Sequence, residues 1–188
     1  MIDAGAVHAA LEKQRKAEQD FVDRVRQNEK APVGWPAALV LFHIGMWRER
    51  MRDSLTAATE GRSYELPGTA DEINERELAA GIGTPLSDAA ARADHLLTEI
   101  EALYEKAIDK PVQWFAAANA TEAVLRNSLS HPRSHIVEYL VENGEVAAAR
   151  QLLDEGLEAL ESMSPSDYVR AVLKRLRDDP RFEDQVTT

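Results

Sequence analysis

Residues 130–140 read SHPRSHIVEYL, and this stretch decides what kind of fold the chain is expected to adopt. Apolar side chains recur in it at helical spacing, so it predicts an α-helix. His131 and His135 are four residues apart, slightly more than one helical turn, which places both imidazoles on one face. Two imidazoles at this separation can bind one transition metal ion.

Pro132 complicates this helix, because it lies between the two histidines. Inside a helix a proline removes one backbone hydrogen bond, here the bond to Ser128, at a cost of about 3 kcal/mol or more. Two interpretations remain open. Either the helix bends at Pro132, or a new helix begins there with Ser130 as its N-cap. Both keep His131 and His135 close, although a bend could turn the first imidazole away from the shared face.

A third histidine, His43, lies far upstream in WPAALVLFHIGMWRERM, residues 35–51. Its helical neighbours include Leu39 and Trp47, so we expect its side chain on an apolar, buried face. A metal ligand is one interpretation of such a residue. The alternative is a core histidine that is hydrogen-bonded to a backbone carbonyl.

The hydrophobic pattern is helical almost throughout, and no alternation typical of a long strand occurs, so the predicted fold class is all-α. Asp3, and Thr69 together with Glu72, are expected to cap helix starts. Proline and glycine mark most of the other ends. The expected long helices span about residues 3–29, 36–60, 85–108, 120–143, 146–160 and 164–176.

The composition is that of a globular protein, with 188 residues, 44% of them hydrophobic and 29% charged. The net charge of −11 disfavours binding to nucleic acids and to anionic membranes. The absence of cysteine excludes disulfides, thiolate ligands and a cysteine nucleophile. The first residues lack the apolar centre of a signal peptide, so we expect a cytoplasmic protein.

The histidine-containing stretches quoted above resemble those of the DinB-like superfamily of four-helix metalloproteins, and most closely those of its ClbS/DfsB-like branch. The resemblance covers roughly residues 5–143. The stretches that carry it are WPAALVLFHIGMWRERM, DEINERELAAGIGTPLSDAAARADHLLTEIEAL and NSLSHPRSH, with Trp35, His43, Trp47, Asn74, Asn127, His131 and His135 at the matching positions.

The resemblance implies a DinB-like up-down four-helix bundle over residues 1–143. We interpret residues 144–180 as a two-helix extension packed on the bundle, and residues 181–188 as a mobile tail.

The resemblance also implies one divalent metal ion bound by His43, His131 and His135. Three neutral imidazoles leave one coordination position open, as in catalytic sites, and they suit zinc, nickel or iron(II). Asn127 and Ser128 lie one turn before His131, so they are candidates for orienting its ring.

Arg50 lies two turns after His43 and is a candidate for binding an anionic group of a substrate. The alternative, which we favour from the sequence, is a solvated arginine in the run RERMR.

For function, the resemblance implies a metal-dependent enzyme that acts on small electrophilic molecules, by thiol S-transfer or by hydrolysis. Some relatives use a low-molecular-weight thiol, and the ClbS-like branch includes proteins that protect their host from a genotoxin by opening a reactive ring. The partner is then a small-molecule substrate, in detoxification or genotoxin protection. The alternative is a non-catalytic helical bundle that sequesters a small molecule or forms a homodimer.

Overall fold

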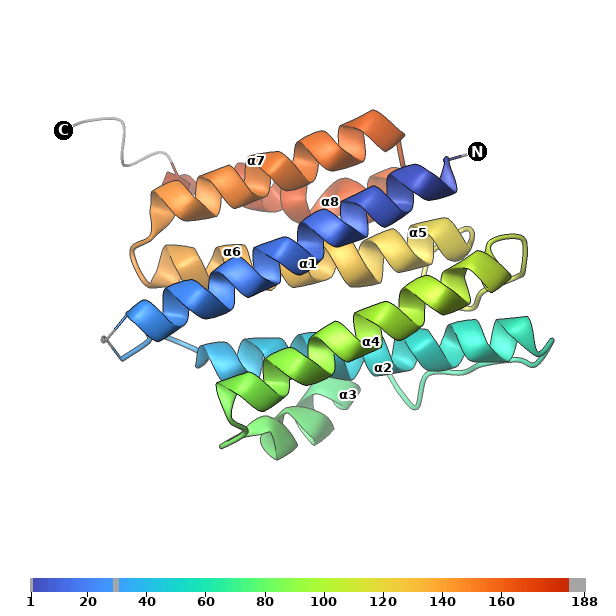
Figure 1. Ribbon diagram of the computed structural model, residues 1–188, viewed down its shortest axis with the longest axis horizontal. Helices are drawn as coiled ribbons and strands as arrows, with labels where there is room; N and C mark the ends of the chain where they lie inside the picture. The colour runs from blue at the N-terminus through green and yellow to red at the C-terminus, as the bar shows by residue number, and fades with distance from the viewer. Residues whose placement is uncertain (1, 29–30, 183–188) are drawn as a thin grey trace.

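The computed structural model describes residues 2–28 and 31–182, and within these residues it contains helices and no strand. The all-α class is therefore confirmed. The α-helices are α1 (Ala4–Gln27), α2 (Ala37–Thr59), α3 (Ala70–Glu77), α4 (Leu86–Ala107), α5 (Ala120–Leu125), α6 (His131–Glu142), α7 (Val146–Met163) and α8 (Asp167–Arg177) (Figure 1). Three short helical segments complete them: η1 (Leu78–Gly81), the π-helical η2 (Arg126–Ser130) and η3 (Pro180–Phe182).

Side-chain caps set several helix ends where the sequence predicts them. The side chain of Asp3 accepts a hydrogen bond from a backbone amide in the first turn of α1. Thr69 and Glu72 form a complete capping box at the start of α3. The expected start of the last helix is wrong. Ser164 ends α7 in the left-handed region, with φ of 49°, and Ser166 is the N-cap of α8.

The helix directions depart from the expected up-down order, because α2 and α4 run parallel. Gly45 of α2 packs against Ala93 of α4, and Arg52 lies 3.5 Å from Glu99 farther along the same two helices. The physical reason is the connection over residues 60–85, which returns along α2 and carries α3 and η1 (Figure 1).

The rod formed by α5, η2 and α6 runs antiparallel to α2, since Asn127 contacts Trp47 whereas the later His135 contacts the earlier His43. The last two helices pack on this rod, with Gly156 of α7 directly against the side chain of Arg133.

The packed chain extends beyond residue 180, whereas a mobile tail is expected from residue 181 onward. Phe182 is 3% exposed, and Arg150 of α7 donates a hydrogen bond to its carbonyl group. The ring of Phe182 also lies under the Arg150 guanidinium, 5.4 Å from it. The remainder of the expected tail, residues 183–188, lies outside the described residues.

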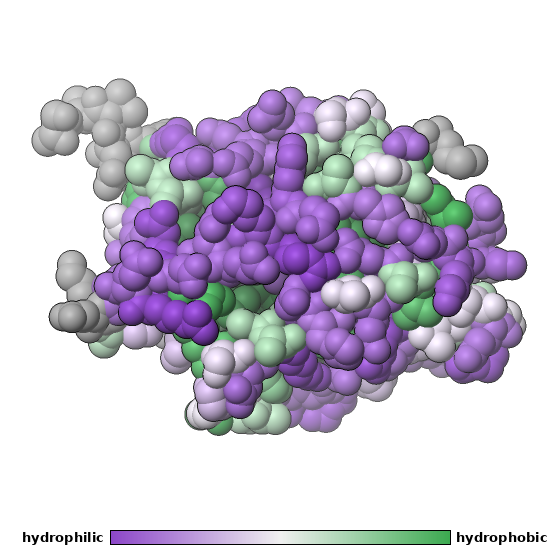
Figure 2. Space-filling view, in the orientation of Figure 1, coloured by the Kyte–Doolittle hydropathy of each residue, from purple (hydrophilic) through white to green (hydrophobic). Residues whose placement is uncertain are grey.

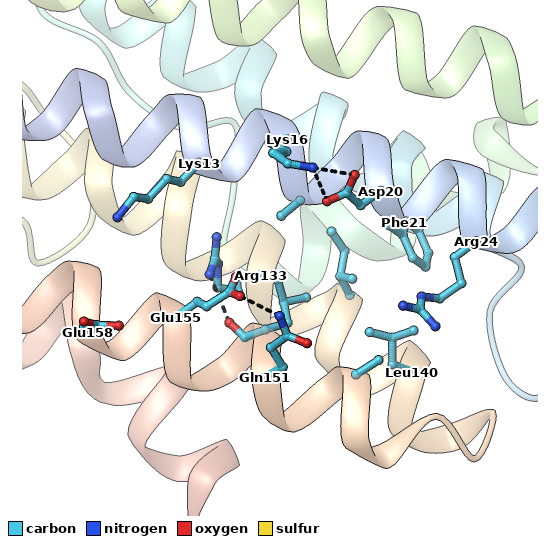
Figure 3. A pocket seen from close by; sticks show the side chains of 14 residues that line it. Lys13, Lys16, Asp20, Phe21, Arg24, Arg133, Leu140, Gln151, Glu155 and Glu158 are labelled. Atoms are coloured by element: carbon cyan, nitrogen blue, oxygen red, sulfur yellow. Dashed lines mark hydrogen bonds and ion pairs between the residues drawn. The ribbon is translucent and has the colours of Figure 1, made fainter.

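Four polar side chains in the interior connect five helices. Glu18 of α1 accepts hydrogen bonds from both terminal nitrogens of Arg48 on α2, at 2.6 and 2.8 Å, and Arg48 also donates to a backbone carbonyl of α4. Gln14 of α1 donates to Glu18 and accepts a hydrogen bond from Arg133 of α6 at 2.9 Å. Arg133 also donates to a backbone carbonyl of α7, toward which it points in Figure 3. We call these four side chains the interior polar network.

The interior polar network explains why the apolar stripe of α1 is thin in its middle. Val7, Leu11 and Phe21 lie on the buried face of α1, and Gln14 and Glu18 occupy the same face between them. Burying a charge is costly unless it is paired and hydrogen-bonded, so these side chains favour the single alignment of helices in which all of them are satisfied.

The face of the molecule shown in Figure 2 is predominantly hydrophilic, and its apolar side chains gather only in small areas. No helix in the described part of the chain is both long enough and apolar enough to cross a membrane.

The interior polar network predicts that removing two different carboxylates of α1 has very different effects on the free energy of unfolding. Glu18→Ala leaves the fully buried Arg48 without its partner, and we expect the free energy of unfolding to fall by about 3–5 kcal/mol. Asp20→Ala breaks the exposed pair with Lys16 and should cost less than about 1 kcal/mol. Urea denaturation of both variants tests this, and equal losses would contradict it.

Candidate metal centre

Three histidines from two helices meet in the structure. Nε2 of His43, on α2, lies 3.0 Å from Nε2 of His131, on α6. Nε2 of His135 lies 3.2 Å from the same His131 atom. One nitrogen from each ring lies within 4.8 Å of the others, and this is the one group of three or more histidine or acidic side chains in the described residues with such spacing. The cluster could hold a metal ion.

A widened turn before α6 resolves the problem posed by Pro132. The segment η2 is π-helical, and the amide of His131 donates to the carbonyl of Arg126, five residues earlier. Pro132 then falls in the first turn of α6, where a missing amide hydrogen is tolerated. The chain therefore neither breaks nor starts a separately capped helix, because the Ser130 side chain makes no cap hydrogen bond. The irregular turn precedes both histidines and leaves their four-residue spacing within α6.

The electrostatic environment keeps the three imidazoles neutral. Burial, reinforced by the repulsion that a protonated His135 would exert, lowers the pKa of His43 to about 3. Burial, together with the nearby Arg126, lowers the pKa of His135 to about 4. Burial and the two other imidazoles hold the pKa of His131 well below its ordinary value. Near neutral pH the rings are therefore uncharged, which is the form of histidine that binds metals.

The distances among the nitrogens suit a small transition metal ion. Nitrogens arranged tetrahedrally at about 2.0–2.1 Å from zinc are separated from one another by about 3.4 Å. The two contacts to His131 Nε2, at 3.0 and 3.2 Å, are close to this separation. The donor set contains nitrogen only, which favours zinc, nickel or iron over calcium or magnesium.

Contacts with Glu138 and Trp35 orient two of the three rings, those of His135 and His43. Nδ1 of His135 lies 3.5 Å from a carboxylate oxygen of Glu138, so its Nε2 faces the cluster. The indole of Trp35 stacks on His135, at 6.1 Å between centroids and an angle of 10°, and presents an edge to His43. Nδ1 of His43 and Nδ1 of His131 are buried and have no hydrogen-bond partner in the described part of the chain.

Asn127 and Ser128, which the sequence suggests as partners of the imidazoles, have other roles in the structure. The amide of Asn127 donates to the Trp47 carbonyl at 3.1 Å, and Ser128 donates to the Asn127 side chain at 2.9 Å. They fasten η2 to α2 and leave His131 Nδ1 without an acceptor.

Arg50 is neither solvated nor part of the cavity beside the histidines. Its side chain pairs with Glu77, the last residue of α3, and donates to the Met46 carbonyl, and the residue is 9% exposed. It therefore fastens the connection after α2.

A cavity of about 570 Å³ opens beside the histidine cluster, a volume typical of small-molecule sites. Its aromatic lining comes from segments far apart in the sequence: Trp35, Trp47, Trp114, Phe115 and Tyr168. The indole of Trp47 donates to Asn74 of α3 at 3.0 Å, which fixes the ring at one wall. Phe115 has φ of 39°, a strained conformation for a bulky residue, and is 53% exposed.

Several residues of this cavity were not expected from the sequence. Glu138 could have been found, because it lies three residues after His135 and so on a neighbouring position of the same helix face. Arg126 and Arg175 also line the cavity, from η2 and α8. Nothing in the local sequence indicates their position, because it follows from the packing of α8 against η2.

Comparisons with known proteins add no relative to this description. No family model, no curated protein and no solved structure matches the chain.

The lowered pKa values predict that acid destabilises the metal-free protein. Unfolding returns the histidines to a pKa near 6.5, so between pH 6.5 and about 4 the unfolded chain binds protons that the folded chain does not. The stabilisation is complete above pH 6.5 and is lost as the pH falls toward 4, at up to about 1.4 kcal/mol per pH unit for each histidine. Urea denaturation across this range measures the slope. His135→Asn should make it shallower, and an unchanged slope would assign the effect to other groups.

Proposed function

We propose that this protein is a divalent-metal-dependent enzyme that acts on small electrophilic molecules. The observation that carries the proposal is the meeting of three neutral imidazole nitrogens at the wall of a cavity of small-molecule size. His43, His131 and His135 would hold zinc, nickel or iron(II). Such an ion, when bound, supplies a Lewis acid that activates water or a thiol.

The proposed reaction is hydrolysis or transfer from an external thiol. The sequence contains no cysteine, so any transferred sulfur must come from a low-molecular-weight thiol as a co-substrate. The aromatic walls provide apolar contacts for the body of an electrophile and limit the access of water. Detoxification of a reactive compound, such as a genotoxin, is the biological role that this chemistry suits, within the cytoplasm.

We further propose that the chain is DinB-like in architecture. The four rods would be α1, α2, α4 and the continuous α5–η2–α6 segment, with α7 and α8 as the addition. Both the order of the residues His43, His131 and His135 and their meeting between α2 and α6 support this assignment.

A second candidate function is sequestration without catalysis. The observation that favours it is the aromatic character of the cavity, which would bind a flat apolar molecule whether or not a metal is present. Metal content separates the two candidates.

The first test is metal analysis of protein purified without a histidine tag. We expect close to one equivalent of transition metal after reconstitution, and less than about a tenth of an equivalent would contradict the enzyme proposal. His135→Ala should abolish uptake while circular dichroism stays helical. The matched control is His95→Ala, whose side chain is 73% exposed and lies outside the cluster. Thiol conjugation of epoxides, measured with and without metal, then separates transfer from hydrolysis.

Glu138 is expected to act as a positioning residue for His135. Glu138→Ala removes the carboxylate that lies against His135 Nδ1, so we expect metal affinity to fall by about 10- to 100-fold. Glu142→Ala, one turn farther along α6 and exposed, is the control and should leave affinity unchanged. Competition with a chelator of known affinity measures both variants, and equal affinities would remove Glu138 from this role.

A further inference from the structure

Two arginines that line the cavity beside the histidine cluster differ from the other arginines of the chain in their lack of polar partners. Every other arginine in residues 2–28 and 31–182 makes a hydrogen bond or an ion pair. Arg126 and Arg175 make neither with any described residue, and both line the cavity. The guanidinium groups that have no partner among the described residues are therefore gathered at the candidate site.

Arg126 is the more informative of the two, because it is partly buried. One of its terminal nitrogens, Nη1, is buried without an acceptor, and the guanidinium lies 5.8 Å from the ring of Tyr168. A desolvated cation without a carboxylate partner is costly, and burial lowers the pKa of Arg126, with a further contribution from Arg175. Its charge also reaches the cluster, since it contributes to the lowered pKa of His135.

No acidic side chain that lines the cavity forms an ion pair with Arg126 or Arg175. Glu138 interacts with the charge of Arg175 but lies in direct contact with His135. Asp71 also lines the cavity and forms no hydrogen bond or ion pair with Arg126. In a protein with a net charge of −11, a local positive region of this kind is needed for an anion to approach.

The groove between α1, α6 and α7 provides an internal comparison (Figure 3). It also contains two arginines, and both have partners: Arg24 pairs with Glu145, and Arg133 bonds Gln14 and the Leu152 carbonyl. The arginines of that groove are therefore paired within the fold, whereas Arg126 and Arg175 have no such partner among the described residues and remain available to a ligand.

We propose that Arg126 and Arg175 bind the carboxylate of the substrate, whose flat apolar body lies against the aromatic wall and whose reactive carbon faces the histidines. The substrate class is thus a small organic monocarboxylate with an aromatic or similarly flat body. A guanidinium pairs with a carboxylate through two parallel hydrogen bonds, which fixes both position and orientation. This inference rests on the proposed function, because it describes the substrate of the same cavity.

The protein contains intrinsic fluorophores that can report the binding of a ligand in this cavity. The sequence has three tryptophans, and Trp35, Trp47 and Trp114 all line this cavity. Tryptophan fluorescence is therefore titrated with phenylacetate and with its neutral isostere phenylacetamide, using both metal-stripped and zinc-loaded protein. We expect phenylacetate to bind at least about tenfold more tightly, because a charged hydrogen-bonded pair is lost with the amide.

Substitutions test whether the two arginines cause the preference for phenylacetate over phenylacetamide. Arg126→Gln and Arg175→Gln should each remove most of it, and Arg126→Lys should restore part. The matched control is Arg177→Gln, on the same helix as Arg175, because Arg177 pairs with Asp178 and does not line the cavity. Arg175 is exposed, so its variant keeps the test valid even where Arg126→Gln fails to fold.

The outcomes separate this inference from the proposed function. Equal binding of acid and amide overturns the inference, even with zinc bound at one equivalent. A preference that disappears on metal removal and survives in Arg126→Gln also overturns it, because the carboxylate then binds the metal. Tighter binding of phenyl phosphate than of phenylacetate overturns the carboxylate assignment. A preference that persists without any metal uptake supports the inference while the proposed function fails.

Discussion

Gln14 and Glu18 of α1 hold in place both helices that carry the histidines. Glu18 binds Arg48, five residues after His43 on α2, and Gln14 binds Arg133, which lies between the two histidines of α6. Successive helical residues are rotated by about 100°, so Arg133 points away from the face that carries the imidazoles. One polar network on the far side thereby sets the rotation of each helix about its axis.

The candidate metal centre depends on this rotation and on the turn that precedes α6. A rotation of either helix by one residue would separate nitrogens that now lie 3.0 and 3.2 Å apart. The π-helical segment accommodates Pro132 without disturbing the histidine pair, and its Asn127 is hydrogen-bonded to the backbone of α2 beside Trp47. π-helical turns of this kind are frequent at functional sites. Here the turn also places Arg126 at the cavity.

The local part of this structure could be predicted from the sequence, because its causes are local. Asp3 and the Thr69–Glu72 box cap the expected helices, and the spacing of His131 and His135 indicates a shared face. The π turn could not be predicted, since Pro132 is compatible with a bend, a new helix or a widened turn, and packing against α2 decides among them.

The contacts between helices that are far apart in the sequence could not be predicted, because they depend on how the helices pack. Gln14 and Glu18 lie at apolar positions of α1, and only the buried arginines of α2 and α6 explain them. The parallel direction of α2 and α4 depends on the path of residues 60–85, which has no periodic pattern. Arg126 and Arg175 come together only when α8 packs on η2. The positive charge at the cavity therefore depends on tertiary packing and not on a local sequence pattern.

The central proposal is that one metal ion binds among His43, His131 and His135. Anomalous diffraction from crystals of the zinc-reconstituted protein tests it most directly. We expect one strong peak at about 2.0–2.1 Å from each of the three Nε2 atoms. A cluster without a peak, its rings turned apart or its zinc bound elsewhere on the molecule, would contradict it.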